Sequence, residues 1–287
     1  MKRIIGVVLA GLLMAGVLVG CGSTATATPG GAVKLAGTVT TGGSTSVEKV
    51  MLALIQQFQD DNRDVTIAYE GNGSGDGITN TKSGLYAIGH SSRDLKTDGS
   101  EDGLTAIDYA IDGIAVVVNK ANGVADLSKE QLFDIYTGKI TNWKDVGGRD
   151  ALIAVITRES GSGTRSGVAD IIGLEKKDKP ETALVANANE ATSTGAVQTA
   201  VEANPDAIGY MSFSDVNADK VKVVKFGGVE ISRATLLNGS YKLQRSFYLL
   251  VRTGATLSPE AQAFIDFVRS DAGKVIIESK NLLVPQR

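Results

Sequence analysis

The stretch Arg158-Glu-Ser-Gly-Ser-Gly-Thr-Arg165 follows an apolar run, Ala151-Leu-Ile-Ala-Val-Ile156. The apolar run predicts a buried strand. The turn after it combines two arginines with serine, threonine and glycine, so it offers many hydrogen-bond donors and little side-chain bulk. The N-terminus of a helix presents unpaired N–H groups and a partial positive charge, which suit an oxyanion. The stretch therefore predicts a strand-to-helix turn that can bind a small anion.

Three further clusters of hydroxyl groups and glycines each lie at a predicted strand-to-helix transition or just after a strand. They are Gly43-Ser-Thr-Ser46, Gly71-Asn-Gly-Ser-Gly-Asp-Gly77 and Gly89-His-Ser-Ser-Arg93. Each cluster alone is also what helix capping or a tight turn requires. Four such clusters in one chain favour a site for a tetrahedral oxyanion, in which Arg158 can hold two oxygens at once.

The chain between these clusters alternates between strand-like and helix-like segments. Apolar residues recur at helical spacing from Val47 to Phe58, and Ser128-Lys-Glu-Gln131 is a capping box before a helix that stops at Gly138. Further helices are predicted over Gly195–Glu202 and from Ser258-Pro259. The other predicted strands are Val33–Val39, Val65–Tyr69, Leu85–Gly89, Gly113–Val118, Val221–Phe226 and Phe247–Val251. This alternation predicts an α/β fold.

The first twenty residues have the pattern of a secretory signal. Lys2 and Arg3 precede an uncharged, mostly apolar stretch, which ends in Leu18-Val-Gly-Cys21. These last four residues resemble the lipobox of bacterial lipoproteins, in which the cysteine is acylated. We therefore expect a signal peptide over 1–20, a lipid on Cys21, and a flexible tether over 21–33 that is rich in glycine, threonine and alanine.

Composition limits the classes of partner. The formal charge of the chain is −3, and it becomes −5 once Lys2 and Arg3 are removed with the signal. A net negative charge argues against nucleic acid as a partner. It also means that an anion site has to be built locally, because the overall field repels small anions.

Motifs for enzymes and metals are missing from the sequence. His90 is the only histidine, and neither Ser74 nor Ser162 lies in a Gly-x-Ser-x-Gly motif. The segment Asp94–Gly103 lacks the last glutamate of a calcium loop. With one histidine and an acylated cysteine, a soft-metal site is disfavoured. We therefore expect no metal, no cofactor and no catalytic residue, with His90 in a structural or surface role.

The motifs together resemble the phosphate-binding proteins of bacterial phosphate ABC transporters. The resemblance covers Val33 to Arg287. Its central match is Arg158-x-x-Gly161-Ser-Gly-Thr164. Supporting matches are Ile135-Tyr-x-Gly138-Lys-Ile-x-x-Trp143, Ala207-Ile-Gly-Tyr210, Gly43-Ser-Thr45, Gly73-Ser74 and Ile88-Gly-x-Ser-Ser-Arg93.

The resemblance implies a two-lobed periplasmic-binding-protein fold of type II, the "Venus flytrap", with the ligand in the cleft between the lobes. We expect lobe I to comprise residues 34–112 and 248–287, and lobe II residues 113–247. It further implies a monomer on the extracytoplasmic face of the cell membrane. This monomer would bind inorganic phosphate and deliver it to the membrane permease of a phosphate ABC transporter.

Carried over by motif position, the residues that would bind phosphate come from both lobes. They are Thr45, Ser46, Ser74, Ser92, Arg158, Ser162, Gly163 and Thr164. Ser92 departs from the family, because some members have an aspartate there that accepts the proton of hydrogen phosphate and so rejects sulfate. A serine can donate and accept, but it does not repel sulfate by charge. Asp76 is a further acceptor candidate, although a turn role is favoured, and Arg165 is expected to be peripheral.

Two alternatives to a phosphate binder stay open at this stage. The Ser92 substitution allows a binder of another tetrahedral oxyanion, such as sulfate, molybdate or a phosphonate. A secreted phosphatase or esterase that uses Ser74 or Ser162 is more distant, because the chain has no second histidine and no two-metal cluster.

Overall fold

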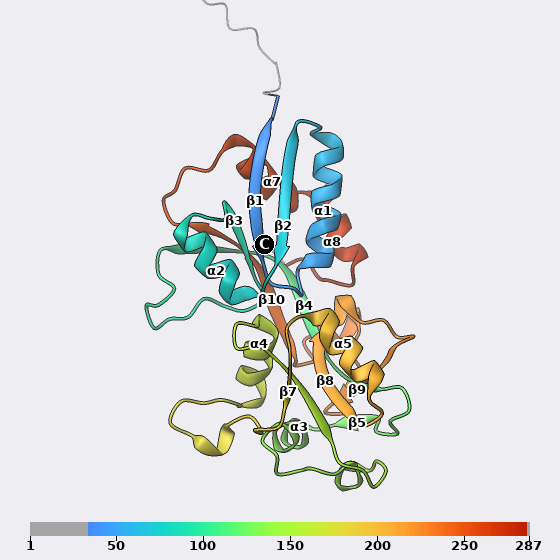
Figure 1. Ribbon diagram of the computed structural model, residues 1–287. Coiled ribbons are helices and arrows are strands. Elements are labelled where there is room, and N and C mark those ends of the chain that lie inside the picture. The colour runs from blue at the N-terminus through green and yellow to red at the C-terminus, as the bar shows by residue number, and fades with distance from the viewer. Residues whose placement is uncertain (1–33, 286–287) are drawn as a thin grey trace, which may run out of the picture. The chain divides into compact units, whose positions relative to one another are not determined.

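Ten strands of the protein form one mixed sheet in the computed structural model, which describes residues 34–285. The expected signal peptide, Cys21 and the tether all lie outside the described residues. The strands are β1 (Gly37–Gly43), β2 (Val65–Gly71), β3 (Ile88–Ser91), β4 (Leu104–Asn119), β5 (Asp126–Leu127), β6 (Ala154–Arg158), β7 (Asn189–Ala191), β8 (Ala207–Ser212), β9 (Val221–Phe226) and β10 (Gln244–Arg252). The helices are α1 (Glu48–Asp61), α2 (Ser74–Ser83), α3 (Lys129–Tyr136), α4 (Gly163–Ile172), α5 (Thr194–Ala203), α6 (Arg233–Leu237), α7 (Pro259–Val268) and α8 (Asp271–Ser279). Figure 1 shows their arrangement.

The sheet follows the order β2-β1-β3-β10-β4-β8-β6-β7, and β9 pairs with β4 and β5. Two separate hydrophobic cores pack against it. One core lies under β1 to β3 with α1, α7 and α8, and it includes Leu54 and Phe264. The other lies under β6, β8 and β9 with α3 to α5, and it includes Trp143 and Val197. We call the elements around the first core lobe I and those around the second core lobe II.

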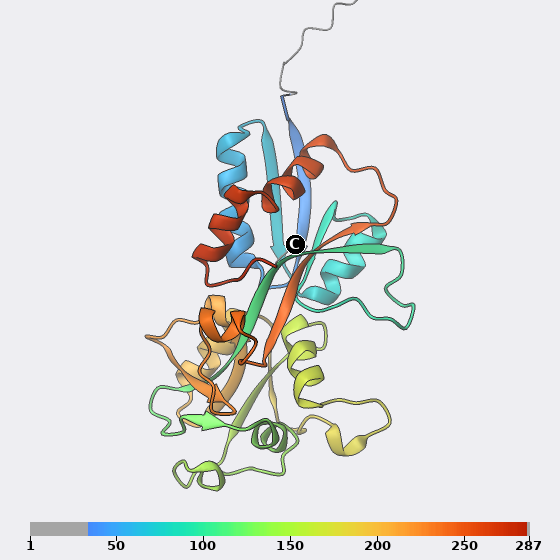
Figure 2. The ribbon, with the colours of Figure 1, turned by 180° about the vertical axis from the view of Figure 1, so that it is seen from behind.

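Two long antiparallel strands, β4 and β10, serve both cores. Along β4, Tyr109 packs in the first core and Ile114 in the second. Phe247 of β10 packs in the first core, and Leu243, which directly precedes β10, packs in the second. Figures 1 and 2 show both strands running from one group of elements to the other. The lobes are thus joined by paired strands, at a point where Arg245 lies opposite Asp112 in the ladder.

Parallel pairing brings the ends of several strands together. In lobe I, Gly43 at the end of β1 lies beside both Gly71 of β2 and His90 of β3. In lobe II, Arg158 at the end of β6 lies beside Ala191 at the end of β7. The carboxyl ends of parallel strands share one sheet edge, and the loops that follow them meet there.

Several local predictions are confirmed by the structure. The capping box is formed, with the Ser128 hydroxyl accepting from the Gln131 N–H and the Gln131 side chain accepting from the Ser128 N–H. Strand β9 has the predicted bounds, and α7 begins at Pro259 with Ser258 as its cap. The predicted α/β fold class is confirmed as well.

Other strand bounds were wrong. Strand β1 begins at Gly37 and continues to Gly43, because the polar Thr40 and Thr41 pair with β2 as readily as apolar residues do. Strand β3 starts three residues later than predicted. Strand β6 starts at Ala154, and Leu152 is 73% exposed. In each case the ladder partner, rather than the apolar run, sets where the strand begins.

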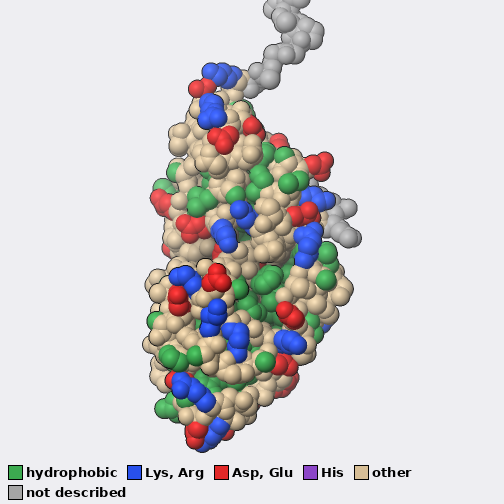
Figure 3. All heavy atoms as spheres, turned by 90° about the vertical axis from the view of Figure 1, so that its right-hand side faces the viewer, with side chains coloured by type: hydrophobic (Ala, Val, Ile, Leu, Met, Phe, Trp, Pro, Cys, Tyr) green, Lys and Arg blue, Asp and Glu red, His purple; other side chains and the backbone are tan. Residues whose placement is uncertain are grey.

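The surface carries charges of both signs. On the face drawn in Figure 3, lysine and arginine side chains are interspersed with aspartate and glutamate. Between residues 34 and 285, none of the helices has the length and apolar composition needed to cross a membrane.

Candidate functional site

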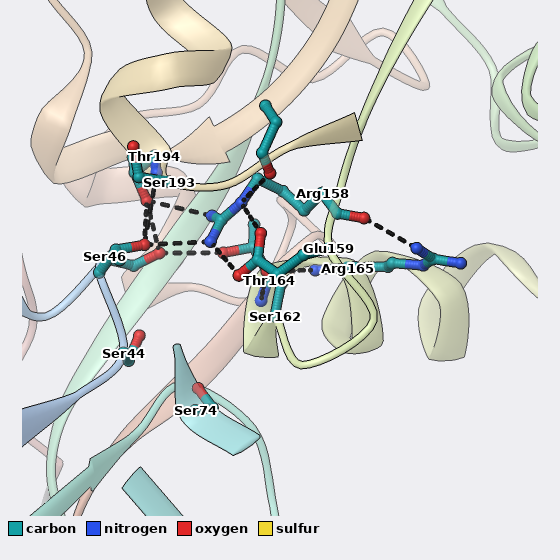
Figure 4. A network of polar contacts seen from close by, with 12 residues as sticks. Ser44, Ser46, Ser74, Arg158, Glu159, Ser162, Thr164, Arg165, Ser193 and Thr194 are labelled. Carbon is teal, nitrogen blue, oxygen red and sulfur yellow. Dashed lines mark hydrogen bonds and ion pairs between the residues drawn. The ribbon is translucent and has the colours of Figure 1, made fainter. Parts of the chain in front are cut away.

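The hydroxyl clusters from both lobes converge between the lobes, and Figure 4 shows them from close by. Ser44, Thr45 and Ser46 follow β1 and precede α1, while Ser74 opens α2. From lobe II come Arg158 at the end of β6, Thr164 in α4 and Thr194 in α5. All of these side chains are buried. We call them, together with Ser92, Ser162, Gly163 and Arg245, the polar cluster.

Arg158 lies at the centre of the polar cluster, and its side chain is only 1% exposed. Its Nε and Nη2 donate to the two carboxylate oxygens of Glu159, at 2.8 and 2.7 Å. Nη2 also donates to Thr45 Oγ1 at 3.1 Å, and Nη1 donates to Thr194 Oγ1 at 3.3 Å. The guanidinium therefore connects the lobes, since Thr45 belongs to lobe I and Thr194 to lobe II.

Hydroxyl groups continue this connection between the lobes. Ser46 Oγ lies 2.9 Å from Thr164 Oγ1 and 3.0 Å from Thr194 Oγ1. Thr45 Oγ1 accepts a hydrogen bond from the Thr194 N–H at 3.3 Å. Each hydroxyl can donate or accept, so these groups can turn their protons toward an anion without moving their heavy atoms far.

Serines of lobe I lie in direct contact with the α4 N-terminus. Ser44 Oγ donates to Ser92 Oγ at 2.8 Å, and the Ser92 N–H donates to Ser74 Oγ at 3.1 Å. A Cβ atom placed on Gly163 would lie 2.4 Å from Ser92 Oγ and 2.5 Å from Ser74 Oγ. The Gly75 N–H donates to the Gly161 carbonyl across the same contact, at 3.0 Å. Glycine at 163 thus lets the two lobes approach one another.

The polar cluster lies at the N-termini of four helices, α1, α2, α4 and α5. Each N-terminus adds about half a positive charge and unpaired N–H groups. The Ser162 hydroxyl accepts from the Thr164 and Arg165 N–H groups at 3.2 and 3.3 Å, so it also caps α4. Ser193 caps α5 in the same way. Ser162, which was predicted to bind an anion, thus also caps a helix in this structure.

Sequence reasoning missed Arg245, which belongs to the polar cluster, and its partner Asp112. Arg245 is 8% exposed, and its Nη2 lies 3.0 Å from Asp112 Oδ2. Its Nη1 donates to Ser92 Oγ at 3.2 Å. The sequence did hold a clue to both charged residues. Asp112 directly precedes the predicted strand Gly113–Val118, and Arg245 lies two residues before the predicted strand Phe247–Val251. Thr194 was also missed, although Ser193-Thr194 directly precedes a predicted helix.

Burial shifts the pKa values of the acidic groups near the site. Burial raises the pKa of Asp112 to about 6, against the opposing effect of the Arg245 guanidinium. Burial and the neighbouring charge of Asp112 raise the pKa of Asp215 to about 7. The Oδ2 atom of Asp215 is buried and has no hydrogen-bond partner among the described residues.

His90 has a structural role in this arrangement. Its ring is fully buried, and burial lowers its pKa to about 3, so it is neutral near pH 7. Its Nε2 lies 2.6 Å from Thr41 Oγ1. Since the Thr41 hydroxyl donates to the Ile88 carbonyl, His90 Nε2 carries the proton and donates to Thr41. Of the two predicted positions, interior or surface, the structure gives the interior.

Two of the weighed residues stay outside the polar cluster. Arg165 pairs with Glu175 at 2.5 Å and with Glu190 at 3.3 Å, and it donates to the Arg158 carbonyl at 2.8 Å. It therefore supports the turn from outside. Asp76 is exposed in the first turn of α2. Over residues 34–285, no group of three or more histidine, cysteine, aspartate or glutamate side chains is arranged to hold a metal ion.

Comparison with known proteins agrees with this geometry. A family model described as the PBP superfamily domain matches residues 26–272. The phosphate-binding protein PstS of Bacillus subtilis (strain 168) is 31% identical over 246 residues, which are 84% of this chain and 78% of that protein.

Solved structures are similar as well. One is described as a phosphate ABC transporter substrate-binding protein with bound phosphate, from Clostridium perfringens. It is 41% identical, with a TM-score of 0.82, over 87% of this chain and 100% of that one. An ABC-type phosphate transport receptor from Vibrio cholerae is 34% identical, with a TM-score of 0.71, over 86% of this chain and 100% of that one. The chain therefore belongs to the PBP superfamily and, within it, to the family of the phosphate-binding protein PstS.

Proposed function

We propose that this chain is an extracytoplasmic solute-binding protein that captures inorganic phosphate and delivers it to the permease of an ABC transporter. One observation carries the proposal. A buried arginine, Arg158, and hydroxyl groups of both lobes converge where four helices begin. The names of the similar proteins, which include phosphate-binding proteins and one structure with bound phosphate, support the same ligand.

Each predicted site residue has a role in this proposal. Arg158 holds two phosphate oxygens with its planar guanidinium. Thr45, Ser46 and Ser74 donate from lobe I, with Ser92 beside them. Ser162 and Thr164 donate from the α4 N-terminus, where Gly163 leaves room for the lobes to meet. Near neutral pH phosphate carries between one and two negative charges, and the helix N-termini offset what Arg158 does not.

Closure of the lobes around phosphate is part of the proposal. We assign residues 34–112 and 248–287 to lobe I and residues 113–247 to lobe II, because β4 and β10 pass from one hydrophobic core to the other near these boundaries. Hydrogen bonds such as Ser46 Oγ to Thr164 Oγ1 join the lobes. Phosphate would add bonds from both lobes and so favour the closed arrangement.

We further propose that a lipid on Cys21 anchors the mature chain as a monomer to the outer face of the cell membrane. The support is the sequence pattern of residues 1–21, with its basic start, apolar stretch and Leu-Val-Gly-Cys ending. Intact-mass measurement of the membrane fraction would show an added acyl mass on wild-type protein. A Cys21→Ser variant that stays equally membrane-bound would contradict the proposal.

Ser74 and Ser162 are better explained as binding residues than as catalytic nucleophiles. His90 is the only histidine of the chain, and it donates to Thr41, not to Ser74 or Ser162. In the part of the chain that the structure describes, neither hydroxyl is hydrogen-bonded to a histidine or a carboxylate, so nucleophilic catalysis lacks its activating partner.

Calorimetry tests the proposed function directly. Protein of residues 22–287, first stripped of copurified anion, is titrated with phosphate near pH 7. We expect tight one-to-one binding. Absence of heat at every temperature tried, with no phosphate-dependent rise in the melting temperature, would refute the proposal.

One observation keeps another tetrahedral oxyanion, such as sulfate, as a candidate ligand. Ser92 Oγ accepts hydrogen bonds from Ser44 and from Arg245, so both of its lone pairs are in use. In this arrangement Ser92 donates and does not accept the proton of hydrogen phosphate. Sulfate competition between about pH 5 and 8 separates the candidates. If sulfate competes equally with phosphate at every pH, the site is a general dianion site.

A further inference from the structure

Arg245 reaches the polar cluster from the strand pair that joins the lobes. Its Cδ lies 3.5 Å from where a Cβ on Gly167 of α4 would stand, so its stem packs against lobe II. Its Nη1 donates to Ser92 Oγ in lobe I. The guanidinium is therefore placed between the serines of lobe I and helix α4 of lobe II, whose N-terminus the proposed phosphate would contact.

Asp112 holds this guanidinium by one edge only. Asp112 Oδ2 accepts from Nε at 3.3 Å and from Nη2 at 3.0 Å. Together with the bond to Ser92, these bonds use three of the five N–H groups of the guanidinium. The edge that carries Nη1 points away from the carboxylate and toward the hydroxyl groups of the site.

A purely structural role for the Arg245–Asp112 ion pair does not explain why Arg245 also contacts Ser92. Asp112 is fully buried, and its Oδ1 accepts from Ser212 Oγ at 2.9 Å. A buried carboxylate needs such partners, and Arg245 supplies the opposite charge. For that purpose alone the guanidinium need not meet Ser92, which itself contacts Ser44 and Ser74.

The charges of the two ion pairs balance before any anion arrives. Arg158 is paired with Glu159, and Arg245 is paired with Asp112. Two cations and two carboxylates leave the centre formally neutral, so the helix N-termini provide its remaining positive potential. Removing one carboxylate charge would therefore leave the centre with a net positive charge, which attracts an anion.

We propose that Arg245 is a second anion-binding arginine of this site and that Asp112, by neutralising it, sets how strongly the site holds an anion. This inference rests on the proposed function, because phosphate is the anion concerned. Arg245 contributes a donor from the lobe-joining strands, and Asp112 weakens the attraction so that the ligand can be released.

Calorimetric titration with phosphate at pH 7 and fixed ionic strength compares four forms of the mature chain: wild-type, Asp112→Asn, Asp112→Asn with Arg245→Gln, and a control. In the control, Arg149→Gln with Asp206→Asn, the same change is made in an ion pair of lobe II that is 2.6 Å long and more exposed. We expect Asp112→Asn to bind phosphate about tenfold more tightly, because one nearby negative charge is gone. We expect the double variant to bind about 100-fold more weakly than Asp112→Asn. The control should stay within about twofold of wild-type.

The outcomes separate the two proposals. If wild-type does not bind phosphate, the proposed function fails. If wild-type binds but Asp112→Asn binds no more tightly, or if the double variant equals Asp112→Asn, the role of Arg245 and Asp112 is refuted. Should Asp112→Asn not fold by circular dichroism, Arg245→Lys decides. A lysine cannot contact Asp112 and the anion together, so about tenfold weaker phosphate binding is expected, and unchanged affinity refutes the inference.

Discussion

Substitution of Gly163 by alanine should wedge the lobes apart without damaging either one. The added Cβ would lie 2.4 Å from Ser92 Oγ, 2.5 Å from Ser74 Oγ and 2.9 Å from the Ser92 carbonyl carbon. Two of these three atoms cannot be moved by a simple rotamer change, because Ser92 C is backbone and Ser74 Oγ holds the Ser92 N–H. Gly163 lies in the first turn of α4 and has no positive φ, so alanine fits its own helix.

The size of the effect follows from these contacts. Comfortable packing requires the lobes to separate by about 1 Å at this point. A shift of that size takes the Ser46–Thr164 bond of 2.9 Å and the Gly75–Gly161 bond of 3.0 Å beyond hydrogen-bond distance. Each lost bond costs about 1 kcal/mol, and a bound phosphate loses at least one donor as well. We expect a total of about 3 kcal/mol, or roughly 100-fold weaker phosphate binding.

Calorimetry with phosphate measures the affinity, and small-angle scattering measures whether phosphate still makes the protein more compact. The matched control is Gly161→Ala in the same turn, where the nearest atom to an added Cβ is Gly75 Cα at 4.0 Å. This control should bind within about threefold of wild-type. Wild-type affinity and compaction in Gly163→Ala would refute the reasoning, because they would mean that the lobes do not meet as described when phosphate binds.

The other predictions concern charge, pH and a helix cap. Arg158→Ala should cost several kcal/mol of phosphate binding, whereas Arg165→Ala should cost less than about 1 kcal/mol; equal losses in calorimetry would mean that the wrong arginine has been chosen. Burial raises the pKa of Asp215 to about 7 in the folded state, whereas an unfolded aspartate loses its proton near pH 4. The contribution of Asp215 to the free energy of unfolding should therefore fall by about 4 kcal/mol as pH rises from 4 to 8, and Asp215→Asn should remove that fall in urea titrations; an unchanged slope would contradict this. Ser128→Ala should lower the free energy of unfolding by about 1 kcal/mol, through the lost capping box, and leave phosphate affinity unchanged; a change in affinity would show that α3 is coupled to the site.

The sequence predicted reliably those features that depend only on neighbouring residues. The capping box at Ser128, the cap at Ser258 and the apolar face from Val47 to Phe58 all depend on residues within a few positions of one another. Strand bounds were less reliable, as at β1 and β6, because a strand begins where a partner from elsewhere in the chain begins.

The candidate site was reached by the same local reasoning. Arg158 and the hydroxyl clusters stand at the ends of strands, and parallel pairing then brings those ends together. Arg245 and Asp112 carry no comparable motif. Their meeting depends on the ladder register of β4 and β10, which pairs positions 133 residues apart.

The sequence by itself determined the α/β class, the chemistry of the anion-binding turn and the family, because composition and short motifs express them. Only the tertiary structure decided that Arg158 and Arg245 lie in one polar cluster, that Ser92 accepts from two donors, and that His90 faces Thr41. These features depend on contacts between segments far apart in the chain. The energy of such contacts comes from burial and close packing, which no local pattern records.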